Sequence, residues 1–243
     1  MKSIVLTSAL LFSAVISAQS QDIALNSARN EVASYTSSAQ DVLLGEFDVK
    51  SKKSKALGKD AYYFENNMGD GIFLKTFLFK VDKARHQTKV NIRLYEKKEF
   101  VQDVYVEYDT ISYPSYIPGN EIATKEITVD IKPGQDGVVE VDLSKYDIKM
   151  PAEGLFVSLE LTGYFDDEGN AITTFKSKDL TKIDIHPTTT DNYCGLASVW
   201  GTDETFWINN NKSIKADFKY AFKKEPSKSI LTAPNFGLKV GDK

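Results

Sequence analysis

The chain has 243 residues, a length that suits one large β domain or two small ones. Its 30 Lys and Arg residues against 34 Asp and Glu residues leave a net charge of -4, which argues against a nucleic-acid partner because such binding needs a clustered basic face. The single cysteine, Cys194, excludes an intrachain disulfide, and we expect it to be a small buried apolar residue.

The first residues have the composition of a secretory signal. Lys2 is followed by an apolar run over residues 4–16, and a small-residue cleavage site ends at Ala18. The run is shorter than the roughly 20 residues of a membrane span. The pattern predicts a signal peptide over residues 1–18 and an exported mature protein, periplasmic, cell-surface or extracellular, with no transmembrane segment after signal removal. The alternative is that the run stays attached as an N-terminal anchor.

Residues 19–60 form a mostly polar N-terminal segment. The apolar residues within 42–47 predict one strand. Residues 50–59 carry five lysines among serines, and we expect a solvated loop there. Contact of this loop with an anionic surface polymer is the alternative.

From residue 61 the chain has the pattern of strand after strand. Residues 71–81 are apolar at both odd and even positions, which is typical of a central strand covered on both faces. Further along, apolar and polar residues alternate with a period of two in residues 88–94, 126–131, 139–143, 155–162, 182–186 and 214–222. This alternation is the one that half-buried strands require.

Turn residues separate these segments, as in residues 133–137 and 166–170, and no long amphipathic helix interrupts them. One apolar and one polar face per strand predict an all-β fold. We expect an antiparallel, jelly-roll-like β-sandwich of about ten strands in residues 61–223. Residues 224–243 show little periodicity, so we expect a C-terminal tail that is loose or lies against an edge strand.

Residues 90–163 carry short pieces in a characteristic order. The pieces are NIRLYE at 91–96, PGNE at 118–121, ITV at 127–129, GVVEVDLSKY at 137–146 and PAEGLFVSLE at 151–160. This order resembles a group of exported bacterial β-sandwich proteins of unassigned function, in which it often follows a carboxypeptidase-regulatory-like β domain. The resemblance implies a sandwich and an envelope location, and it brings no catalytic residues. In this chain, residues 97–116 look like an insertion.

The insertion gathers tyrosines close to several carboxylates. The tyrosines are Tyr105, Tyr108, Tyr113 and Tyr116. Because exposed aromatic faces stack on sugar rings and carboxylates accept hydrogen bonds from hydroxyls, we predict a ligand platform here. The alternative is an extra hairpin whose tyrosines pack on the sandwich edge.

Two tryptophans, Trp200 and Trp207, flank a hairpin-like turn over residues 201–206. A pair of tryptophans at a loop tip suits glycan binding, so both residues join the predicted ligand-binding set. The alternative, which such residues adopt more often, is packing in the sandwich core.

No catalytic motif stands out, and we predict that the chain is not an enzyme and has no catalytic residues. A Gly-x-Ser-x-Gly elbow, a His-Glu-x-x-His pair and a phosphate-binding glycine loop are all absent from the sequence. Glu140 and Asp142 share one strand face about 7 Å apart, a separation used in glycoside hydrolysis. Lys145 stands where the third acid of a Glu-x-Asp-x-x-Glu strand would be.

We predict no metal site and no cofactor, with Ca²⁺ as the alternative. The acidic turn over residues 166–170 holds oxygen ligands of the type calcium prefers, but it lacks the spaced ligand set of an EF-hand loop. We expect an ordinary solvated turn. The two histidines, His86 and His186, are too few for a typical zinc site, and both are expected at the surface.

These features predict an exported, non-catalytic β-sandwich protein that binds a ligand at the cell envelope or outside the cell. Polysaccharide is the favoured ligand class, ahead of an envelope protein. The alternative is a structural or assembly subunit that adds an edge strand to an envelope partner. The second alternative is a carboxylate-based glycoside hydrolase.

Overall fold

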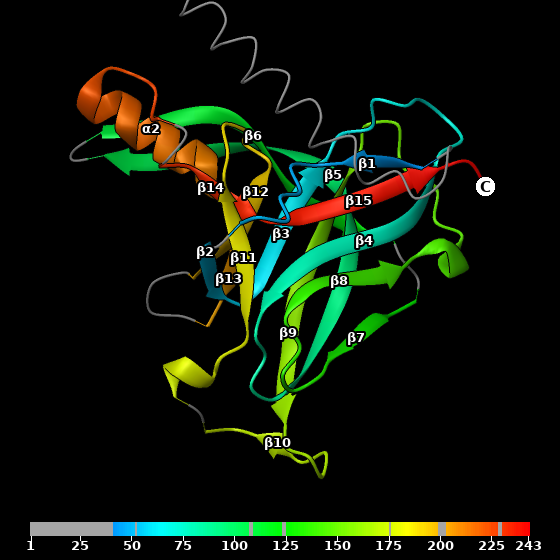
Figure 1. Cartoon of the computed structure of the whole chain (residues 1–243). Coiled ribbons are helices and arrows are strands. Elements are labelled where there is room, and N and C mark those ends of the chain that lie inside the picture. Colours follow the sequence, from blue (N-terminus) through cyan, green and yellow to red (C-terminus); the bar gives the residue numbers. More distant parts are fainter. Residues whose placement is uncertain are drawn as a thin grey trace, which may run out of the picture. The chain divides into compact units, whose positions relative to one another are not determined.

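Two antiparallel sheets build the fold of this chain. The computed structural model describes residues 41–51, 53–106, 109–122, 125–174, 176–198, 203–227 and 230–243, with only the backbone described at 104–106 and 109. Residues Val42–Lys243 form one unit (Figure 1). The predicted all-β antiparallel sandwich is confirmed, although fifteen strands in the described part exceed the roughly ten expected.

The first sheet, called sheet A, has seven strands. Their order is β1 (Val42–Leu44), β15 (Phe236–Gly241), β4 (Phe73–Asp82), β11 (Lys182–Pro187) and β14 (Thr232–Pro234), with β2 (Lys53–Ala56) on β11 and β8 (Gly137–Asp142) on β4. Strand β4 is central, as predicted, because β15, β11 and β8 all pair with it. Its neighbouring residues Phe77 and Leu78 are both fully buried, so both faces of this strand are covered.

The second sheet, called sheet B, has eight strands. Their order is β13 (Thr205–Asn209), β12 (Tyr193–Ser198), β3 (Lys59–Phe64), β9 (Leu155–Phe165), β5 (Gln87–Val106) and β6 (Asp109–Glu121), with β10 (Ala171–Ile172) on β9 and β7 (Ile127–Ile131) on β5. The two ends of this order, β13 and β6, also contact each other. Sheet B therefore curls nearly into a barrel. Two short 3₁₀ helices, η2 (Ser144–Tyr146) and η3 (Ser177–Asp179), lie in connections.

The main core lies between the two sheets. It takes Phe77 and Phe236 from sheet A, whose rings meet edge to face with centroids 5.2 Å apart. From sheet B it takes Phe64, Ile92 and Val157, which point inward from β3, β5 and β9. Burial of such large side chains supplies the main stabilisation of the sandwich.

A second apolar cluster lies on the opposite face of sheet B, inside its curl. Its buried members are Ala61, Tyr63, Tyr95, Ile117, Phe156 and Cys194. They come from β3, β5, β6, β9 and β12, so the cluster joins strands that are far apart in the sheet order. As predicted, Cys194 is a buried apolar residue, with no exposed surface. Burial raises the pKa of its thiol, because a thiolate is disfavoured away from water.

The strand predicted over residues 214–222 was wrong, because this segment is the helix α2 (Asn210–Phe222). Asn209 begins it as an N-cap, its side-chain oxygen accepting a hydrogen bond from the Lys212 backbone amide. Lys223 ends it in the left-handed conformation, with φ of 55°. Among the described helices, none is both long and apolar enough to cross a membrane.

The alternation that suggested a strand also contains the spacing of a helix. Every second residue is apolar from Ile214 to Phe222, so residues four apart are apolar as well, and these lie on one helix face. Phe218 and Phe222 form such a pair, with ring centroids 4.6 Å apart. The preceding asparagines then favour a helix start over a strand end.

Residues 224–243 were expected to form a tail that is loose or lies against an edge strand. The segment is not loose: its strand β15 pairs with the end strand β1 and also with the central strand β4. Strand β15 lies between β1 and β4 in sheet A, with Phe236 opposite Phe79 in the register (Figure 1). Phe236, Leu238 and Val240 are fully buried. The chain after residue 223 therefore supplies a central part of the core. The position of this segment depends on pairing with strands that are distant in the sequence. Its two prolines, Pro226 and Pro234, lie outside β15.

Two expectations about polar residues need correction. The segment 50–59, expected as a solvated loop, contains β2, and Lys55 there pairs with the buried Asp60 at 2.5 Å. His186, expected at the surface, is only 4% exposed. Its position on β11 brings Nε2 to 3.2 Å from a carboxylate oxygen of Glu46. Both residues, Lys55 and His186, lie on strands of sheet A and have a carboxylate partner within the fold.

Candidate functional site

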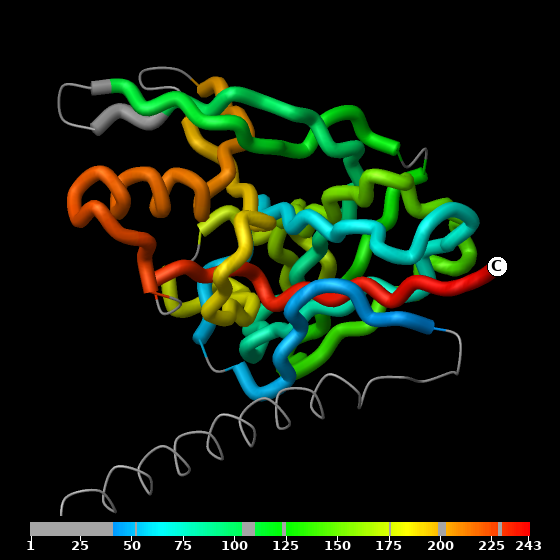
Figure 2. The backbone as a smooth tube through the Cα atoms, turned by 90° about the horizontal axis from the view of Figure 1, so that it is seen from above, coloured from blue at the N-terminus to red at the C-terminus, as the bar shows by residue number. Residues whose placement is uncertain are grey.

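The predicted insertion is the long hairpin of β5 and β6, which extends beyond the other strands of sheet B (Figure 2). Its four tyrosines have different positions. Tyr108 lies outside the described residues, as does Trp200, and of Tyr105 only the backbone in β5 is described. Tyr113 and Tyr116 lie on β6, and both are half-buried.

Tyr116 packs inward against the second apolar cluster. Its ring lies 5.0 Å from that of Tyr63 and 6.1 Å from that of Phe156. Its hydroxyl donates a hydrogen bond to the Asn192 side chain at 3.1 Å. Burial raises the pKa of Tyr116, and the nearby Asp191 carboxylate adds to the effect. The packing alternative therefore describes this residue better than the ligand platform does.

Trp207 also belongs to a packed environment. It lies on β13, half-buried against the same cluster, and meets the ring of Tyr95 edge to face at 6.2 Å. The Lys59 ammonium lies 5.3 Å from its ring centroid, in a cation–π contact. The core alternative fits Trp207, because its indole ring already has neighbours within the fold.

Tyr113 has a different surrounding, because it lines a groove. The groove lies between α2 and the β5–β6 hairpin and has a volume of about 960 Å³. Its lining residues are Ile111, Tyr113, Pro114, Thr189, Asp191, Lys212, Lys215, Ala216, Lys219, Tyr220, Lys223, Glu225, Pro226 and Leu231. The lining combines aromatic and proline rings with charged groups, a mixture that is typical of ligand sites.

Gln102 on β5 holds the two walls together at the N-terminal end of α2. Its side chain is 4% exposed and donates to the Asn209 carbonyl at 3.2 Å and to the Ser213 hydroxyl at 2.5 Å. The Tyr113 hydroxyl lies 3.3 Å from the same amide nitrogen, which has two hydrogens to share among these three oxygens. The Asn209 backbone amide donates back to the side-chain oxygen of Gln102 at 3.0 Å. The hairpin and the helix are therefore joined by a buried polar network.

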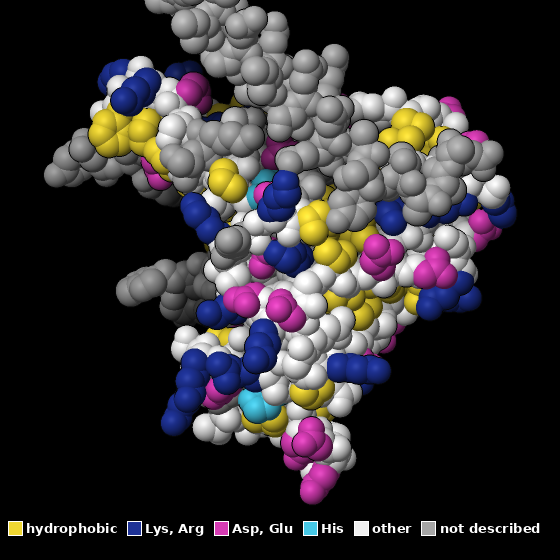
Figure 3. Space-filling view, viewed as in Figure 1, with side chains coloured by type: hydrophobic (Ala, Val, Ile, Leu, Met, Phe, Trp, Pro, Cys, Tyr) yellow, Lys and Arg dark blue, Asp and Glu magenta, His cyan; other side chains and the backbone are white. Residues whose placement is uncertain are grey.

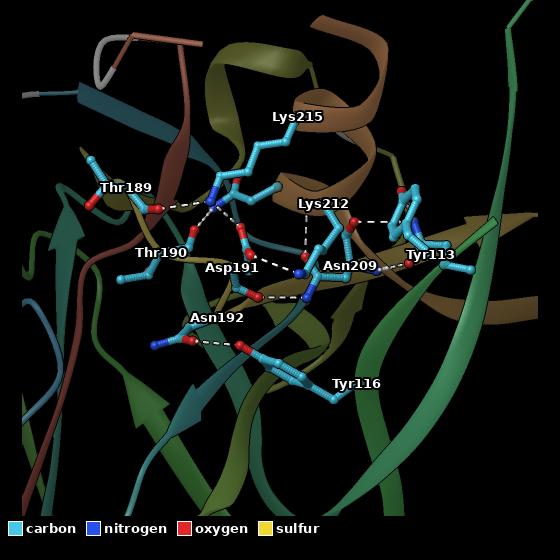
Figure 4. A network of polar contacts seen from close by, with 11 residues as sticks. Tyr113, Tyr116, Thr189, Thr190, Asp191, Asn192, Asn209, Lys212 and Lys215 are labelled. Atoms are coloured by element: carbon cyan, nitrogen blue, oxygen red, sulfur yellow. Dashed lines mark hydrogen bonds and ion pairs between the residues drawn. The ribbon is translucent and has the colours of Figure 1, made fainter. Parts of the chain in front are cut away.

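Asp191 lines the groove and binds two lysines of α2 (Figure 4). Its carboxylate lies 2.5 Å from the Lys215 ammonium and 3.1 Å from the Lys212 ammonium. Lys215 also donates to the Thr189 carbonyl at 3.0 Å. A carboxylate beside the first turns of a helix is favoured by the helix dipole. The Asn209 side chain fixes this loop by donating to the Asp191 carbonyl at 2.6 Å.

The other end of the groove carries lysines without a carboxylate partner. Lys219 and Lys223 lie near the end of α2, both exposed, and neither forms an ion pair within the described part of the chain. The Lys223 ammonium lies 4.8 Å from the ring centroid of Tyr220. In the space-filling view, basic side chains stand beside an apolar patch where α2 ends (Figure 3). Phe222, the last residue of α2, is 61% exposed.

The carboxylates predicted as a possible glycosidase pair lie elsewhere. Glu140 is exposed on β8, 3.8 Å from the Lys239 ammonium, and the exposed Asp142 accepts a hydrogen bond from the Ser144 backbone amide. Neither residue lines the groove. A glycosidase acid needs a raised pKa from a buried setting, which an exposed strand face does not supply.

The acidic turn after β9 satisfies its own polar groups. The Asp166 carboxylate accepts hydrogen bonds from the backbone amides of Glu168 and Asn170, at 3.0 and 2.8 Å. These bonds lower the pKa of Asp166, and the bond from the Asn170 backbone amide has the largest effect. The expected solvated turn is what the structure shows. Across the described ranges, no group of three or more His, Cys, Asp or Glu residues is placed to hold a metal ion.

Sequence reasoning missed the groove because it treated its main wall as a strand. The lysines at positions 212, 215, 219 and 223 have the spacing of one helix face, and three asparagines at 209–211 precede them. That spacing was the available signal. Asp191 and Gln102 gave no local signal, since their roles depend on contacts with residues far away in the chain.

Comparisons with known proteins leave the family open. No protein-family model matches the chain, and no curated protein matches its sequence. A solved structure with similarity is that of the cysteine protease and lectin-like domains of Cwp84, a surface layer associated protein of Clostridium difficile. The two share 9% identity at a TM-score of 0.40, over 85% of this chain and 37% of that one. This chain thus spans little more than a third of that structure, and we draw no functional conclusion from the similarity. The resemblance to exported sandwich proteins stays a prediction.

Proposed function

We propose that this protein is an exported, non-catalytic β-sandwich protein that binds a polysaccharide in the groove between α2 and the β5–β6 hairpin. The groove is the observation that carries the proposal, because its volume of about 960 Å³ is enough for several sugar units. Export is proposed from the signal-peptide pattern of residues 1–18. A binding role is proposed over a catalytic one because the sequence lacks a recognised catalytic motif.

The lining of the groove suits sugars. Tyr113 and Tyr220 offer aromatic rings, and Pro114 and Pro226 add further apolar surface. Sugar rings present both apolar faces and hydroxyl groups, so they need apolar surface beside hydrogen-bonding groups. The hydrogen-bonding groups are supplied by the lysines of α2, together with Thr189 and Asp191.

The groove is preformed, which favours binding. Gln102 ties β5 to the start of α2, and Asp191 ties the neighbouring loop to the same helix. Because these groups are already ordered, a ligand does not have to immobilise both walls. Hydrogen-bonded walls of this kind hold the groove open in one geometry.

The assembly alternative has less support. Strand addition needs an edge with several free backbone groups. The end strands of sheet A, β1 and β14, have three residues each. Within the described residues the longer edges are those of β8, which pairs with β4 alone, and β7, which pairs with β5 alone. Sheet B brings its own end strands, β13 and β6, into contact. We favour a ligand in the groove over an added strand because the lining of the groove combines aromatic and polar groups suited to sugars.

Thermal unfolding of the mature protein, residues 19–243, with a panel of neutral and acidic polysaccharides tests the proposal. A ligand bound only by the folded state stabilises it by about 2.7 kcal/mol at a hundredfold excess over Kd. We expect a saturable rise in Tm with at least one polymer. A panel in which no polymer raises Tm would contradict the proposed function.

A pair of variants places the ligand in the groove. Tyr220→Ala removes an aromatic ring from the groove wall and replaces it with a good helix former. We expect it to weaken binding with little loss of stability. Phe206→Ala is the matched control, because Phe206 is a 46% exposed aromatic residue on β13 that does not line the groove. Equal loss of binding in both variants would contradict the placement.

A further inference from the structure

We infer that the groove binds an acidic polysaccharide, and that Lys219 and Lys223 pair with its anionic groups. The inference rests on the proposed function and names its ligand class. It follows from the distribution of charge along α2, where four lysines line one groove in a protein whose net charge is -4. Asp191 and Glu225 are the acidic residues of the lining, so the groove is a local region of positive charge.

The first two lysines are already neutralised by the protein itself. Lys212 and Lys215 both contact the Asp191 carboxylate, and Asp191 is largely shielded from solvent, with 18% of its side chain exposed. Partly buried ion pairs of this kind are screened less by salt than exposed ones. This end of the groove therefore contains its own anion and attracts a second one weakly.

The last two lysines lack such an anion. Lys219 and Lys223 are exposed on the groove wall, and no carboxylate in the described part of the chain pairs with them. Lys219 lies in the last turn of α2, and Lys223 is the C-cap that follows Phe222, four residues further along the chain than Lys219. Two exposed lysines on the wall of one groove suit a ligand that carries repeated negative charge.

Tyr220, beside the two lysines, favours an acidic polysaccharide over polyanions that lack sugar rings. Tyr220 lies between these lysines in sequence, lines the same groove, and has the Lys223 ammonium 4.8 Å from its ring centroid. An acidic sugar combines a carboxylate for the lysines with a ring face for the tyrosine. Pro226 continues the apolar wall at this end of the groove.

Binding to polymer pairs that differ only in charge tests the inference. Polygalacturonate is compared with its methyl ester, and carboxymethyl cellulose with hydroxyethyl cellulose, each against the mature protein. We expect tighter binding of the acidic member in at least one pair. We also expect this preference to shrink between about 50 mM and about 500 mM NaCl, because exposed charges are screened by salt.

The lysine variants connect the preference to the groove. Lys219→Gln/Lys223→Gln keeps helix propensity and removes both charges, and we expect about three- to tenfold weaker binding of the acidic polymer, as two exposed ion pairs would contribute. Binding of the neutral polymer stays unchanged. Lys219→Arg/Lys223→Arg retains acidic binding. The control Lys132→Gln/Lys178→Gln removes two exposed lysines outside the groove and leaves binding unchanged.

Each failure has its own signature. Equal binding of the acidic and neutral members, unaffected by the lysine variants, would overturn the acidic class and keep the proposed function. Poly-L-glutamate that binds as tightly as the acidic polymers, with the same dependence on Lys219 and Lys223, would overturn the polysaccharide class. If the protein binds no polymer of either pair and no polymer of the wider panel raises its Tm, both the proposed function and the acidic ligand class are overturned.

Discussion

Gln102 on β5 and Asn209 at the start of α2 are joined by two hydrogen bonds of opposite direction. The Gln102 side-chain amide donates to the Asn209 carbonyl at 3.2 Å, and the Asn209 backbone amide donates to the Gln102 side-chain oxygen at 3.0 Å. Both residues are buried. One side chain thus satisfies a backbone donor and a backbone acceptor at the point where β13 ends and α2 begins.

We expect Gln102→Ala to destabilise the protein by about 1–3 kcal/mol, because it leaves the buried Asn209 amide without its acceptor, while the Asn209 carbonyl keeps the Ser213 hydroxyl as a donor. Urea unfolding measures the change. Ser112→Ala is the control on the same hairpin, since its bond to Asp103 is exposed and should contribute less than about 1 kcal/mol. Equal unfolding midpoints for Gln102→Ala and the unmodified protein would contradict the role assigned to this network.

Asp191→Asn should lower the stability of the fold and strengthen the binding of an acidic polysaccharide. The substitution keeps the shape of the side chain and removes the negative charge that Lys212 and Lys215 share. We expect a loss of stability of about 1 kcal/mol and tighter binding of polygalacturonate, because two more positive charges then face the groove. Unfolding and titration measure the two effects. Weaker binding with unchanged stability would contradict the assigned role of Asp191 as the neutralising anion.

Stability should fall steeply above pH 10. The pKa is raised, with burial as the leading cause, for seven tyrosines: Tyr62, Tyr63, Tyr95, Tyr113, Tyr116, Tyr164 and Tyr193. For Tyr63 it is raised to about 12. Because the unfolded chain loses these protons at lower pH than the folded one, stability is fully present below about pH 10 and is lost as pH rises toward 12.

Ultraviolet absorbance of tyrosinate measures this directly. We expect part of the signal to titrate near the ordinary tyrosine pKa and the rest to appear together with the loss of β-sheet circular dichroism. A single reversible titration near pH 10, with the circular dichroism retained to pH 12, would contradict the burial of these hydroxyls.

The thiol of Cys194 should be unreactive in the folded protein. It is fully buried, and burial raises its pKa, so the nucleophilic thiolate is scarce as well as inaccessible. We expect a thiol reagent to label the chain only after unfolding in urea. Rapid stoichiometric labelling under native conditions, at the rate of a free cysteine, would show that the second apolar cluster is open.

The C-terminal strand should be necessary for folding. We expect truncation after Lys223 to abolish the cooperative unfolding transition, because it removes β14 and β15 from sheet A. Phe236→Ala should cost about 3–5 kcal/mol, as for other large core aromatics. Removal of the exposed Asp242 and Lys243 is the control. A truncated chain that unfolds with the midpoint of the full protein would contradict the position of β15.

Local periodicity was a good guide where one face of a segment is buried. It predicted the strands within β5, β7, β9 and β11, and the turn at Asp166, because these features are set by neighbouring residues. It misled at residues 214–222, where the same spacing serves a strand or a helix and only the cap at Asn209 favours the helix. In β15, the alternation of Phe236, Leu238 and Val240 was present in the sequence and was overlooked beside the prolines.

By itself, the sequence determined an all-β antiparallel architecture, a buried cysteine and a long tyrosine-bearing hairpin, since each follows from side-chain type and spacing within a few residues. Only the tertiary structure decided that Gln102, Tyr113, Asp191 and α2 surround one groove. The physical reason is that these contacts arise from the curl of sheet B, which brings β13 to β6. The lysines of α2 acquire different roles in the same way, because a distant aspartate neutralises two of them and leaves two facing the groove.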